Sequence, residues 1–390
     1  MLRRVYFTPY GVGLGHASRL LILATKLKEF GYESRFSSFG EAKNYLNIQG
    51  YICNSIPPVE FLWGREGEFS VKYNITKIPQ WLTNLPIQVN KEIVYLKKYN
   101  PHIIISDSRL SSLFAGKILN IPTILLINQI KLLLTPALRK LEIVKFFETC
   151  IGEFMGGLWN TSDKILIPDL PPPYTISEET INTVKSIKSK INYIGFIAPK
   201  KNISDDKVDE VIKSIKIDKN KKLIFVHISG PKETRKPIIL KIMETCNNLN
   251  NIQFIFSEGK ANGDTNPRKL SHNIWYYEWC PCRDEIFYLA DFLIIRGGHT
   301  AISQAIQFGK PFISIPIENH GEQISNSNKI EKLGIGIKLD SKLINAKIIE
   351  ESIKEIILDK KYNKKILQLM EISNSLDGIE NIKNIIFSNI

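Results

Sequence analysis

The sequence has few cysteines and no long apolar run, and both absences restrict what the protein can be. Its 5 cysteines among 390 residues are too few and too dispersed for a disulfide framework, so we expect a reducing, cytoplasmic environment. Cys280 and Cys282 lack the second pair of ligands that a zinc site needs. Polar residues interrupt the best membrane-spanning candidate, 121–134, which is shorter than the roughly 18 residues of a span. The chain enters a glycine-rich loop near its N-terminus, so we expect no signal peptide.

Acidic residues are fewer than basic ones, which gives a net charge of +13 and a pI near 9.3. This sign favours an anionic partner: nucleic acid, a phosphate-bearing small molecule or an acidic membrane surface. Because no basic-aromatic motif of the RNP1 type is present, we expect no nucleic-acid partner. The length predicts about two domains, and the 43% hydrophobic and 23% charged residues are typical of globular proteins.

Short apolar segments alternate with helical patterns along the chain, which predicts parallel sheets with crossover helices. A segment rich in proline, glycine and aromatic residues, 55–86, interrupts this alternation and is predicted to be a functional loop, followed by a helix from Pro86 to Tyr99. We therefore predict an α/β fold with two Rossmann-like domains facing across a cleft. The first domain is 1–195, the second is 196–370, and a C-terminal helix over 371–390 packs back towards the first domain.

A strand predicted over 292–295 leads into Arg296, Gly297, Gly298, His299 and Thr300, where a helix begins. Glycines between a strand and a helix leave backbone N–H groups free at the positive end of the helix dipole. The segment therefore predicts a phosphate-binding site.

Two further segments of the second domain extend this site. Ser229 and Gly230 form a second glycine turn at a neighbouring strand end, where they would contact the same diphosphate. Glu322 and Gln323 close the loop 318–323 and would bind sugar hydroxyls; simple surface polarity is the alternative.

The glycines near the N-terminus, Gly11, Gly13 and Gly15, are spaced GxGxG rather than GxGxxG, and no acidic residue closes the second predicted strand. Both features disfavour a dinucleotide site. His16 follows in the first helical turn, at the sheet edge where open α/β folds bind ligands. A helix N-terminus disfavours the imidazolium, so we expect a neutral, proton-accepting ring. A helix-capping or core histidine is the alternative.

Asp107 follows an apolar strand at the same predicted edge. Its carboxylate would accept a hydrogen bond from the second ring nitrogen of His16, which would form a dyad. In the alternative interpretation, Asp107 or Ser108 is the N-cap of the helix that begins near Leu110.

Apolar residues recur at helical spacing over 131–159, a segment that also contains basic residues. Our first interpretation is that this apolar face packs into the domain core; the second is peripheral docking on acidic lipid. The apolar residues are Leu138, Leu141, Val144, Phe147, Ile151, Phe154 and Leu158, and the basic ones are Arg139, Lys140 and Lys145.

Four segments make the chain resemble GT-B glycosyltransferases, in particular the family 28 branch that includes MurG, plant galactolipid synthases and archaeal relatives. The most specific is RGGHTAISQAIQFGKPFISIPIENHGEQ, which begins at Arg296; the others are GVGLGH from Gly11, the Tyr193–Gly195 joint and the turn beginning at Ile228. The resemblance implies inverting transfer from a nucleotide-diphosphate sugar, with no metal and no cofactor beyond that co-substrate. The second domain would hold the donor, and the first would hold the acceptor.

The resemblance also implies individual roles. The backbone at Cys280 would meet the base, and Gln304 stands where the family has a glutamate that contacts the ribose. Asn128 replaces another family glutamate and cannot act as a base, so the expected catalytic pair is His16 with Asp107. The remaining donor-binding residues would be Ser229, Gly230, Arg296, Gly297, Gly298, His299, Thr300, Glu322 and Gln323, and the acceptor-side loop would contain Gly11, Gly13, Gly15 and Asn128.

The expected reaction moves a hexose or N-acetylhexosamine from a UDP-linked donor to the hydroxyl of a lipid-linked or glycan acceptor. Segment 131–159 would contact an acidic membrane surface, which places the protein peripherally on the inner face of the cell membrane. The alternatives are a nucleotide-sugar 2-epimerase and a non-catalytic nucleotide-sugar-binding subunit.

Overall fold

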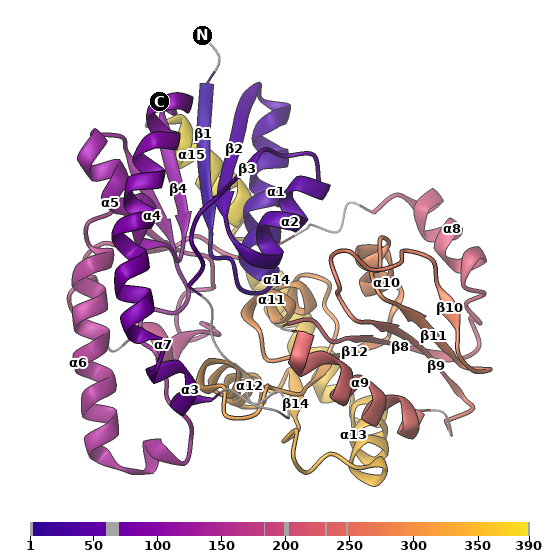
Figure 1. The fold of residues 1–390 in the computed structure, drawn as a ribbon. Helices are drawn as coiled ribbons and strands as arrows, with labels where there is room; N and C mark the ends of the chain where they lie inside the picture. Colours follow the sequence, from indigo (N-terminus) through magenta and orange to yellow (C-terminus); the bar gives the residue numbers. More distant parts are fainter. Residues whose placement is uncertain are drawn as a thin grey trace. The chain divides into compact units, whose positions relative to one another are not determined.

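The computed structural model describes residues 3–59, 70–182, 184–198, 203–230, 232–246 and 249–388. Within them the fold is α/β, with helices packed on parallel sheets (Figure 1). The chain divides into two compact units. Unit 1 contains the described residues of 3–198 and the C-terminal segment 376–388, and unit 2 contains those of 203–375.

The described part of unit 1 has a seven-stranded sheet in the order β3-β2-β1-β4-β5-β6-β7, with every pair parallel. The order reverses between β1 and β4, and open α/β sheets commonly bind ligands at such a reversal. The strands are β1 (Arg3–Pro9), β2 (Tyr32–Ser38), β3 (Cys53–Ser55), β4 (Ile103–Asp107), β5 (Thr123–Leu126), β6 (Lys164–Ile167) and β7 (Ile191–Tyr193).

The helices of unit 1 cover both faces of this sheet, and one of them is longer than predicted. Helix α4 begins at Ile78 rather than at Pro86, which lies inside it and removes one backbone hydrogen bond. The part of the predicted loop over 60–69 lies outside the described residues. The helices are α1 (Gly15–Glu29), α2 (Gly40–Ile48), α3 (Val71–Ile75), α4 (Ile78–Tyr99), α5 (Leu110–Leu119), α6 (Glu142–Trp159), α7 (Glu178–Ile181) and α15 (Gly378–Phe387), with a 3-10 turn at Leu138–Lys140.

Unit 2 has the same kind of architecture. The strand order in its described part is β10-β11-β9-β8-β12-β13-β14, in which β10 alone is antiparallel, and the order reverses between β8 and β12. The strands are β8 (Lys222–His227), β9 (Ile252–Ser257), β10 (Arg268–Lys269), β11 (Ile274–Tyr277), β12 (Phe292–Ile295), β13 (Phe312–Ser314) and β14 (Gly336–Lys338). The helices are α8 (Asp205–Ser214), α9 (Lys232–Cys246), α10 (Arg283–Leu289), α11 (His299–Gln307), α12 (Gly321–Leu333), α13 (Ala346–Leu358) and α14 (Lys360–Asn374).

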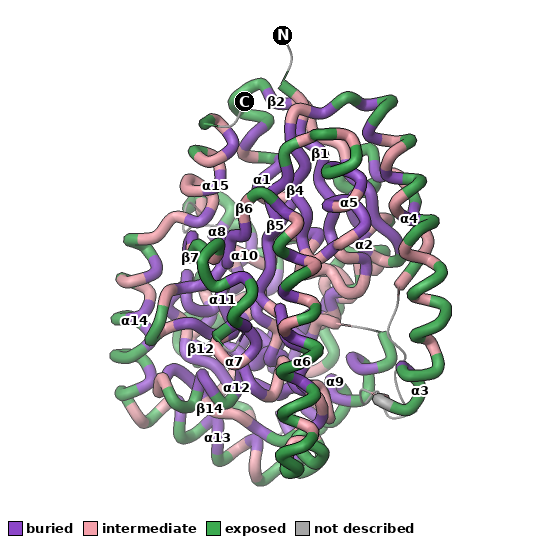
Figure 2. The backbone as a smooth tube through the Cα atoms, turned by 90° about the vertical axis from the view of Figure 1, so that its left-hand side faces the viewer, coloured by how far each residue is buried: buried purple, intermediate pink, exposed green. Residues whose placement is uncertain are grey.

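Buried residues follow the strands in each unit, and exposed residues lie on the outer helix faces (Figure 2). The central strands are almost continuously apolar because helices cover both sides of the sheet. Ile224, Val226, Phe254, Phe256 and Ile294 of unit 2 belong to one such core.

The C-terminal helix α15 packs on α1 of unit 1. The ring of Phe387 stacks on Tyr32 with centroids 5.5 Å apart and meets the edge of Phe30 at 5.7 Å. Gly195, at φ 84°, and Gly378 allow the two chain segments that lead to and from unit 2 to approach closely: a Cβ on Gly378 would lie 2.5 Å from the carbonyl oxygen of Gly195. Segment 371–390 is thus divided, because its first residues end α14 in unit 2.

Candidate functional site

The strand reversal in unit 1 brings His16 and Asp107 together. His16 lies in the first turn of α1, Asp107 ends β4, and β1 pairs with β4. His16 Nδ1 lies 2.7 Å from Asp107 Oδ1. Donation by Nδ1–H to this carboxylate leaves Nε2 as the proton-accepting atom. The N-cap interpretation of Asp107 and Ser108 is wrong, because Arg109 occupies the N-cap position of α5.

Arg19 completes this arrangement and was missed from the sequence. It follows His16 by one turn of α1 and donates to both oxygens of Asp107, from Nε at 2.9 Å and Nη2 at 2.7 Å. Its Nη1 and Nη2 also lie 3.4 and 3.3 Å from Oδ1 of Asn128, which follows β5. The i, i+3 spacing of His16 and Arg19 was the available signal, since it places both side chains on one helix face.

The carboxylate of Asp107 is fully buried and remains ionised. Burial alone would raise the pKa of Asp107, but Arg19 and His16 beside it lower the pKa below its usual value. Arg19 balances the negative charge of Asp107, so this carboxylate remains paired when His16 is neutral. A proton that arrives on His16 would also be stabilised by Asp107.

The predicted acceptor-side glycines lie in the loop between β1 and α1. Gly13 adopts a left-handed conformation with φ 70°, which favours glycine. Gly11 packs against the ring of Phe39 and leaves no room for a side chain. The ring of Tyr10 meets His16 edge-on with centroids 5.8 Å apart. The loop therefore borders His16, whose side chain remains 26% exposed.

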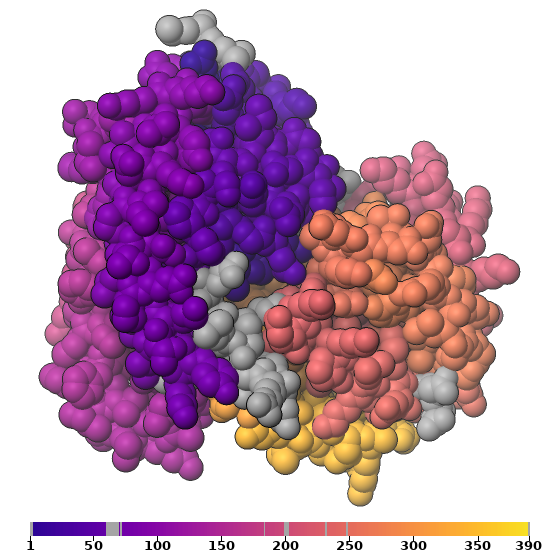
Figure 3. All heavy atoms as spheres, in the orientation of Figure 1, coloured from indigo at the N-terminus to yellow at the C-terminus, as the bar shows by residue number. Residues whose placement is uncertain are grey.

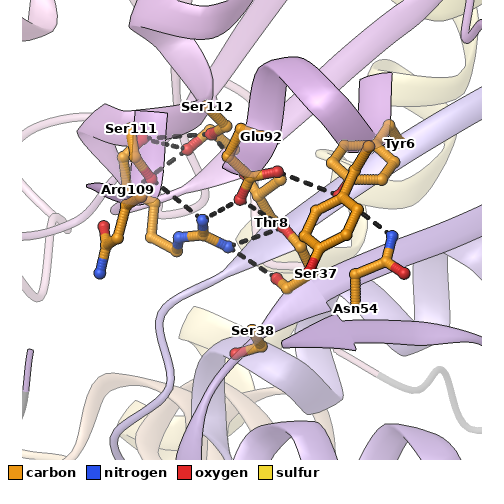
Figure 4. Close-up of polar contacts among 12 residues, drawn as sticks. Tyr6, Thr8, Ser37, Ser38, Asn54, Glu92, Arg109, Ser111 and Ser112 are labelled. Atoms are coloured by element: carbon orange, nitrogen blue, oxygen red, sulfur yellow. Dashed lines mark hydrogen bonds and ion pairs between the residues drawn. The ribbon is translucent and has the colours of Figure 1, made fainter. Parts of the chain in front are cut away.

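A buried polar network holds the turn that carries Asp107. Arg109 extends its guanidinium into the interior, where it donates to the backbone oxygen of Ser37 at 2.6 Å and forms an ion pair with Glu92 of α4 (Figure 4). Glu92 also accepts hydrogen bonds from the hydroxyls of Ser37 and Tyr6, at 2.6 and 3.0 Å. Removing one partner of such a pair leaves an uncompensated buried charge. The network thus fixes the backbone two residues beyond Asp107.

The strand reversal in unit 2 places the two predicted glycine turns next to each other. Gly230, with φ 125°, lies in the loop after β8, and Gly297 and Gly298 follow β12, which pairs with β8. Helix α11 begins at His299 with Gly298 as its N-cap, and a Cβ on Gly298 would meet no atom within 4 Å. The N–H groups of the first helical turn therefore border open space.

Arg296 is a buried cation beside these turns. Its side chain donates to the backbone oxygens of Ile315, at 3.1 Å, and Thr234. Across the described residues it forms no ion pair with a carboxylate, and its Nε has no hydrogen-bond partner. Arg296 is only 5% exposed, and burial lowers its pKa to about 10. An uncompensated buried charge at a helix N-terminus favours an anionic ligand.

The other predicted donor-side residues differ in burial and in hydrogen bonding. Glu322 and Gln323 belong to the first turn of α12 rather than to a loop, and Gln323 Oε1 accepts from the backbone N–H of Ile317 at 2.9 Å. His299 is buried with its Nδ1 3.3 Å from Ser303 Oγ, whereas Thr300 in the same turn is partly exposed.

Cys280 is buried just before α10, and burial raises the pKa of its thiol. Gln304 is also buried, and it donates to Asp284. Pro231, part of the turn beginning at Ile228, lies outside the described residues. Of the residues described, no group of three histidine, cysteine, aspartate or glutamate side chains is placed to hold a metal ion.

Residues 206–380 match the glycosyltransferase family 28 C-terminal domain. The chain is 29% identical to an uncharacterized glycosyltransferase of Methanosarcina mazei, over 96% of both chains. The chain is thus similar to glycosyltransferases over almost its whole length, and its second half resembles the family 28 C-terminal domain.

The chain also has a more distant bacterial relative. It is 24% identical, over 96% of both chains, to the UDP-N-acetylglucosamine–N-acetylmuramyl-(pentapeptide) pyrophosphoryl-undecaprenol N-acetylglucosamine transferase of Clostridium perfringens. Its fold is that of GT-B enzymes. The glycotransferase of kitacinnamycin superposes on the whole chain with a TM-score of 0.70 at 15% identity. The Streptomyces glycosyltransferase SsfS6, in complex with thymidine diphosphate, superposes with a TM-score of 0.65 at 13% identity, and each chain is 99% covered.

The apolar face of α6 is exposed, so the interpretation that it packs into the core is wrong. Phe147 and Phe154 are both exposed, the latter at 67%. Much of α6 has the colour of exposed residues in Figure 2. The helix packs instead through Gly152 and Gly156, whose added Cβ atoms would press on Lys131 and Ser186. Glu148 and Trp159 are also buried on this inner face, and the exposed apolar side chains lie on the other side of the helix.

Segment 138–159, magenta in Figure 3, lies at the surface of the view. Of the predicted basic residues, Arg139 is engaged by Glu148 and Glu179, whereas Lys140 and Lys145 are exposed. Across the described residues, no helix is both long and apolar enough to cross a bilayer.

Proposed function

We propose that this protein transfers a sugar from a nucleotide-diphosphate sugar to an acceptor hydroxyl, with inversion at the anomeric carbon. The observation that carries the proposal is the contact between His16 Nδ1 and Asp107 Oδ1, because it leaves Nε2 free to accept a proton. The uncompensated charge of Arg296 supports the binding of the donor diphosphate in unit 2.

The reaction is a single displacement. The acceptor hydroxyl gives its proton to His16 Nε2 while its oxygen forms a bond to the anomeric carbon. The bond between that carbon and the diphosphate oxygen breaks, and the electron pair leaves with the diphosphate. Asp107 stabilises the imidazolium, and Arg19 holds Asp107 in place. Arg296 and the N-terminus of α11 stabilise the departing diphosphate, so the proposal includes no metal and no cofactor besides the sugar nucleotide.

The proposed donor is a UDP-linked hexose or N-acetylhexosamine. The name of the Clostridium perfringens relative, which includes a UDP-linked N-acetylated sugar, supports this class. Glu322 and Gln323, which are partly exposed in the first turn of α12, are proposed to bind the sugar hydroxyls. The backbone at Cys280 is proposed to meet the base.

The proposed acceptor is lipid-linked and reaches the enzyme at an acidic membrane face. The exposed apolar side chains of α6 support this, because burying a single phenylalanine in lipid contributes about 1.5–3 kcal/mol. Lys140 and Lys145 beside them would favour acidic headgroups. The name of the Clostridium perfringens relative includes a pyrophosphoryl-undecaprenol acceptor, which supports the same class.

The proposal is tested in two steps. Thermal unfolding with UDP-, GDP- and dTDP-sugars identifies the donor, because a ligand of the folded state raises the midpoint. Turnover is then measured with that donor and a polar-lipid extract, and the anomeric configuration of the product is determined. Product formed without any acceptor would indicate a 2-epimerase instead, and binding without any product would indicate a non-catalytic subunit.

A further inference from the structure

The carboxylate of Asp284 in unit 2 is held entirely through one of its two oxygens. Gln304 Nε2 donates to Asp284 Oδ1 at 2.6 Å, and Nε and Nη2 of Arg283 lie 3.1 Å from the same atom. Across the described residues, Oδ2 makes no hydrogen bond and no ion pair. One oxygen is thus fixed by neighbours while the other is left to an external donor.

The position of this carboxylate places it beside the phosphate-binding turns of the same unit. Asp284 lies in the first turn of α10, which follows β11, and Gln304 lies in α11, which follows β12. Both helices begin at the carboxyl edge of one sheet, where Arg296 and Gly298 also lie. Gln304 is almost completely buried, whereas the side chain of Asp284 is 33% exposed. A buried amide therefore orients an accessible carboxylate.

A carboxylate at this edge selects one part of a nucleotide. An ionised carboxylate only accepts hydrogen bonds, so it repels the phosphates that Arg296 attracts. The neutral part of a nucleoside diphosphate next to the phosphates is the ribose, whose hydroxyls are donors. An acidic side chain that accepts from the ribose 2′-hydroxyl is a general solution in nucleotide-binding α/β folds.

We propose that Asp284, oriented by Gln304, accepts a hydrogen bond from the ribose 2′-hydroxyl of the donor nucleotide. The protein therefore binds ribonucleotide donors in preference to 2′-deoxyribonucleotide donors. This inference rests on the proposed function, because it assigns a contact within the donor site. Asp284 is the specificity-determining residue, and Gln304 is a positioning residue.

The role of Gln304 follows from its chemistry. Its amide nitrogen supplies the hydrogen bond that turns Oδ2 of Asp284 outwards. Gln304→Glu would bring two carboxylates into contact, and like charges at that distance repel each other. Pairing Gln304→Glu with Asp284→Asn restores a donor and an acceptor, because the new amide nitrogen donates to the new carboxylate.

The test measures the affinities of UDP and 2′-deoxy-UDP by calorimetry on the full chain. We expect the unmodified protein to prefer UDP by about 10- to 100-fold, the range of one hydrogen bond to a charged group. Asp284→Ala should bring the ratio of the two affinities close to 1, because it should weaken the binding of UDP and leave that of 2′-deoxy-UDP unchanged. Glu285→Ala, which removes a carboxylate from the same helical turn, should leave the ratio unchanged.

The positioning role is tested with the Gln304 variants. Gln304→Glu should lower the UDP preference, and the double variant Gln304→Glu/Asp284→Asn should recover part of it. Asp284→Asn, which keeps the size of the side chain, replaces Asp284→Ala if the latter unfolds.

Equal affinity of the unmodified protein for the two nucleotides overturns the inference, and so does an unchanged ratio in the Asp284 variants. In both cases UDP still binds, so the proposed donor site stands. If UDP, GDP and dTDP all fail to bind, the proposed function is overturned and this inference falls with it.

Discussion

The two units share a strand-reversal topology, but the charges at the two reversal points differ. In unit 1, the buried carboxylate of Asp107 contacts Arg19, His16 and the hydroxyl of Ser108, and its charge is balanced within the protein. In unit 2, the buried guanidinium of Arg296 is hydrogen-bonded to backbone oxygens and is balanced by no carboxylate among the described residues. The site in unit 1, whose charges balance, suits a neutral ligand that exchanges a proton. The unpaired cation in unit 2 suits an anionic ligand.

The surfaces of the two units differ in a similar way. Unit 1 has exposed large apolar residues on α3, α4 and α6, and those of α6 lie within about three turns: Ile143, Phe146, Phe147, Ile151 and Phe154. In unit 2 they are scattered over several elements, as at Leu240 and Leu358. A concentrated patch marks an interaction surface, whereas isolated residues do not.

The largest expected effect is the loss of the base in unit 1. His16→Ala should lower kcat by about 10²- to 10⁴-fold, the usual contribution of a general base. Affinity for the nucleotide should not change, because the proposed donor site lies in unit 2. His272→Ala, an exposed histidine in unit 2, serves as the control and should keep full turnover. Unchanged turnover of His16→Ala would refute the role of this residue.

Removing Arg19, the counter-ion of Asp107, should leave a buried negative charge in unit 1 without its cation and so destabilise the fold. Arg19→Met should lower the free energy of unfolding by about 3 kcal/mol at neutral pH, because a buried charge loses a partner. The folded-state pKa of Asp107 is below its usual value, so its ionisation stabilises the protein above about pH 4, the unfolded-state pKa. This stabilisation is lost as the pH falls through the folded-state pKa. Urea unfolding should therefore show that the difference in free energy of unfolding between the unmodified protein and Arg19→Met becomes smaller below about pH 4.

Arg19→Lys provides the comparison for this experiment. It keeps the charge but loses the two-pronged contact with the carboxylate, so its stability should lie between those of the unmodified protein and Arg19→Met. A difference between unmodified protein and Arg19→Met that stays constant between pH 3 and pH 7 would contradict the assigned ion pair.

Removing the unbalanced cation should have opposite effects on binding and stability in unit 2. Arg296→Met should weaken UDP binding by about 10- to 100-fold through the loss of a charged hydrogen bond. Its thermal midpoint should stay the same or rise, because an uncompensated buried charge is costly. Calorimetry and thermal unfolding measure the two effects. Arg268→Met, at an exposed arginine of the same unit, should change neither.

The smallest expected effect concerns the surface of unit 1. Phe147→Ser and Phe154→Ser should each lower binding to vesicles that contain acidic phospholipid by about 10-fold, because less apolar area enters the bilayer. Co-sedimentation measures the bound fraction. Leu240→Ser and Leu358→Ser make the same kind of change at exposed sites of unit 2 and should leave binding unaltered. Equal losses in both units would contradict a dedicated membrane surface on α6.

The fold was predictable because its signals are local. Glycine turns after apolar strands and the alternation of strand and helix predicted the α/β architecture, and the GT-B fold is confirmed by the structural relatives. Strand β12 has the predicted bounds. The start of α4 was predicted wrongly, since Pro86 was taken as a helix start although surrounding turns accommodate it inside the helix.

The contacts of the candidate site were only partly predictable. His16 and Asp107 follow strands that end at one edge, so their proximity could be inferred from topology. The i, i+3 spacing places Arg19 on the same helix face as His16, but it does not identify Asp107 and Asn128 as its partners. The pairing of Asp284 with Gln304 likewise follows no spacing rule. The periodicity of α6 predicted an apolar face but not its direction, which depends on the inward-facing Gly152 and Gly156.

The close approach of Gly195 and Gly378 means that the chain leaves unit 1 and returns to it at one place. In genetic terms, unit 2 is an insertion into unit 1, which is the host domain. The two segments of the host domain, before and after unit 2 in the sequence, are adjacent in space. A gene that ends at codon 198 would lack α15 and leave Phe30 and Tyr32 uncovered. A gene in which a short linker replaces codons 199–375 would keep that helix, so the host domain is better isolated by excision than by truncation.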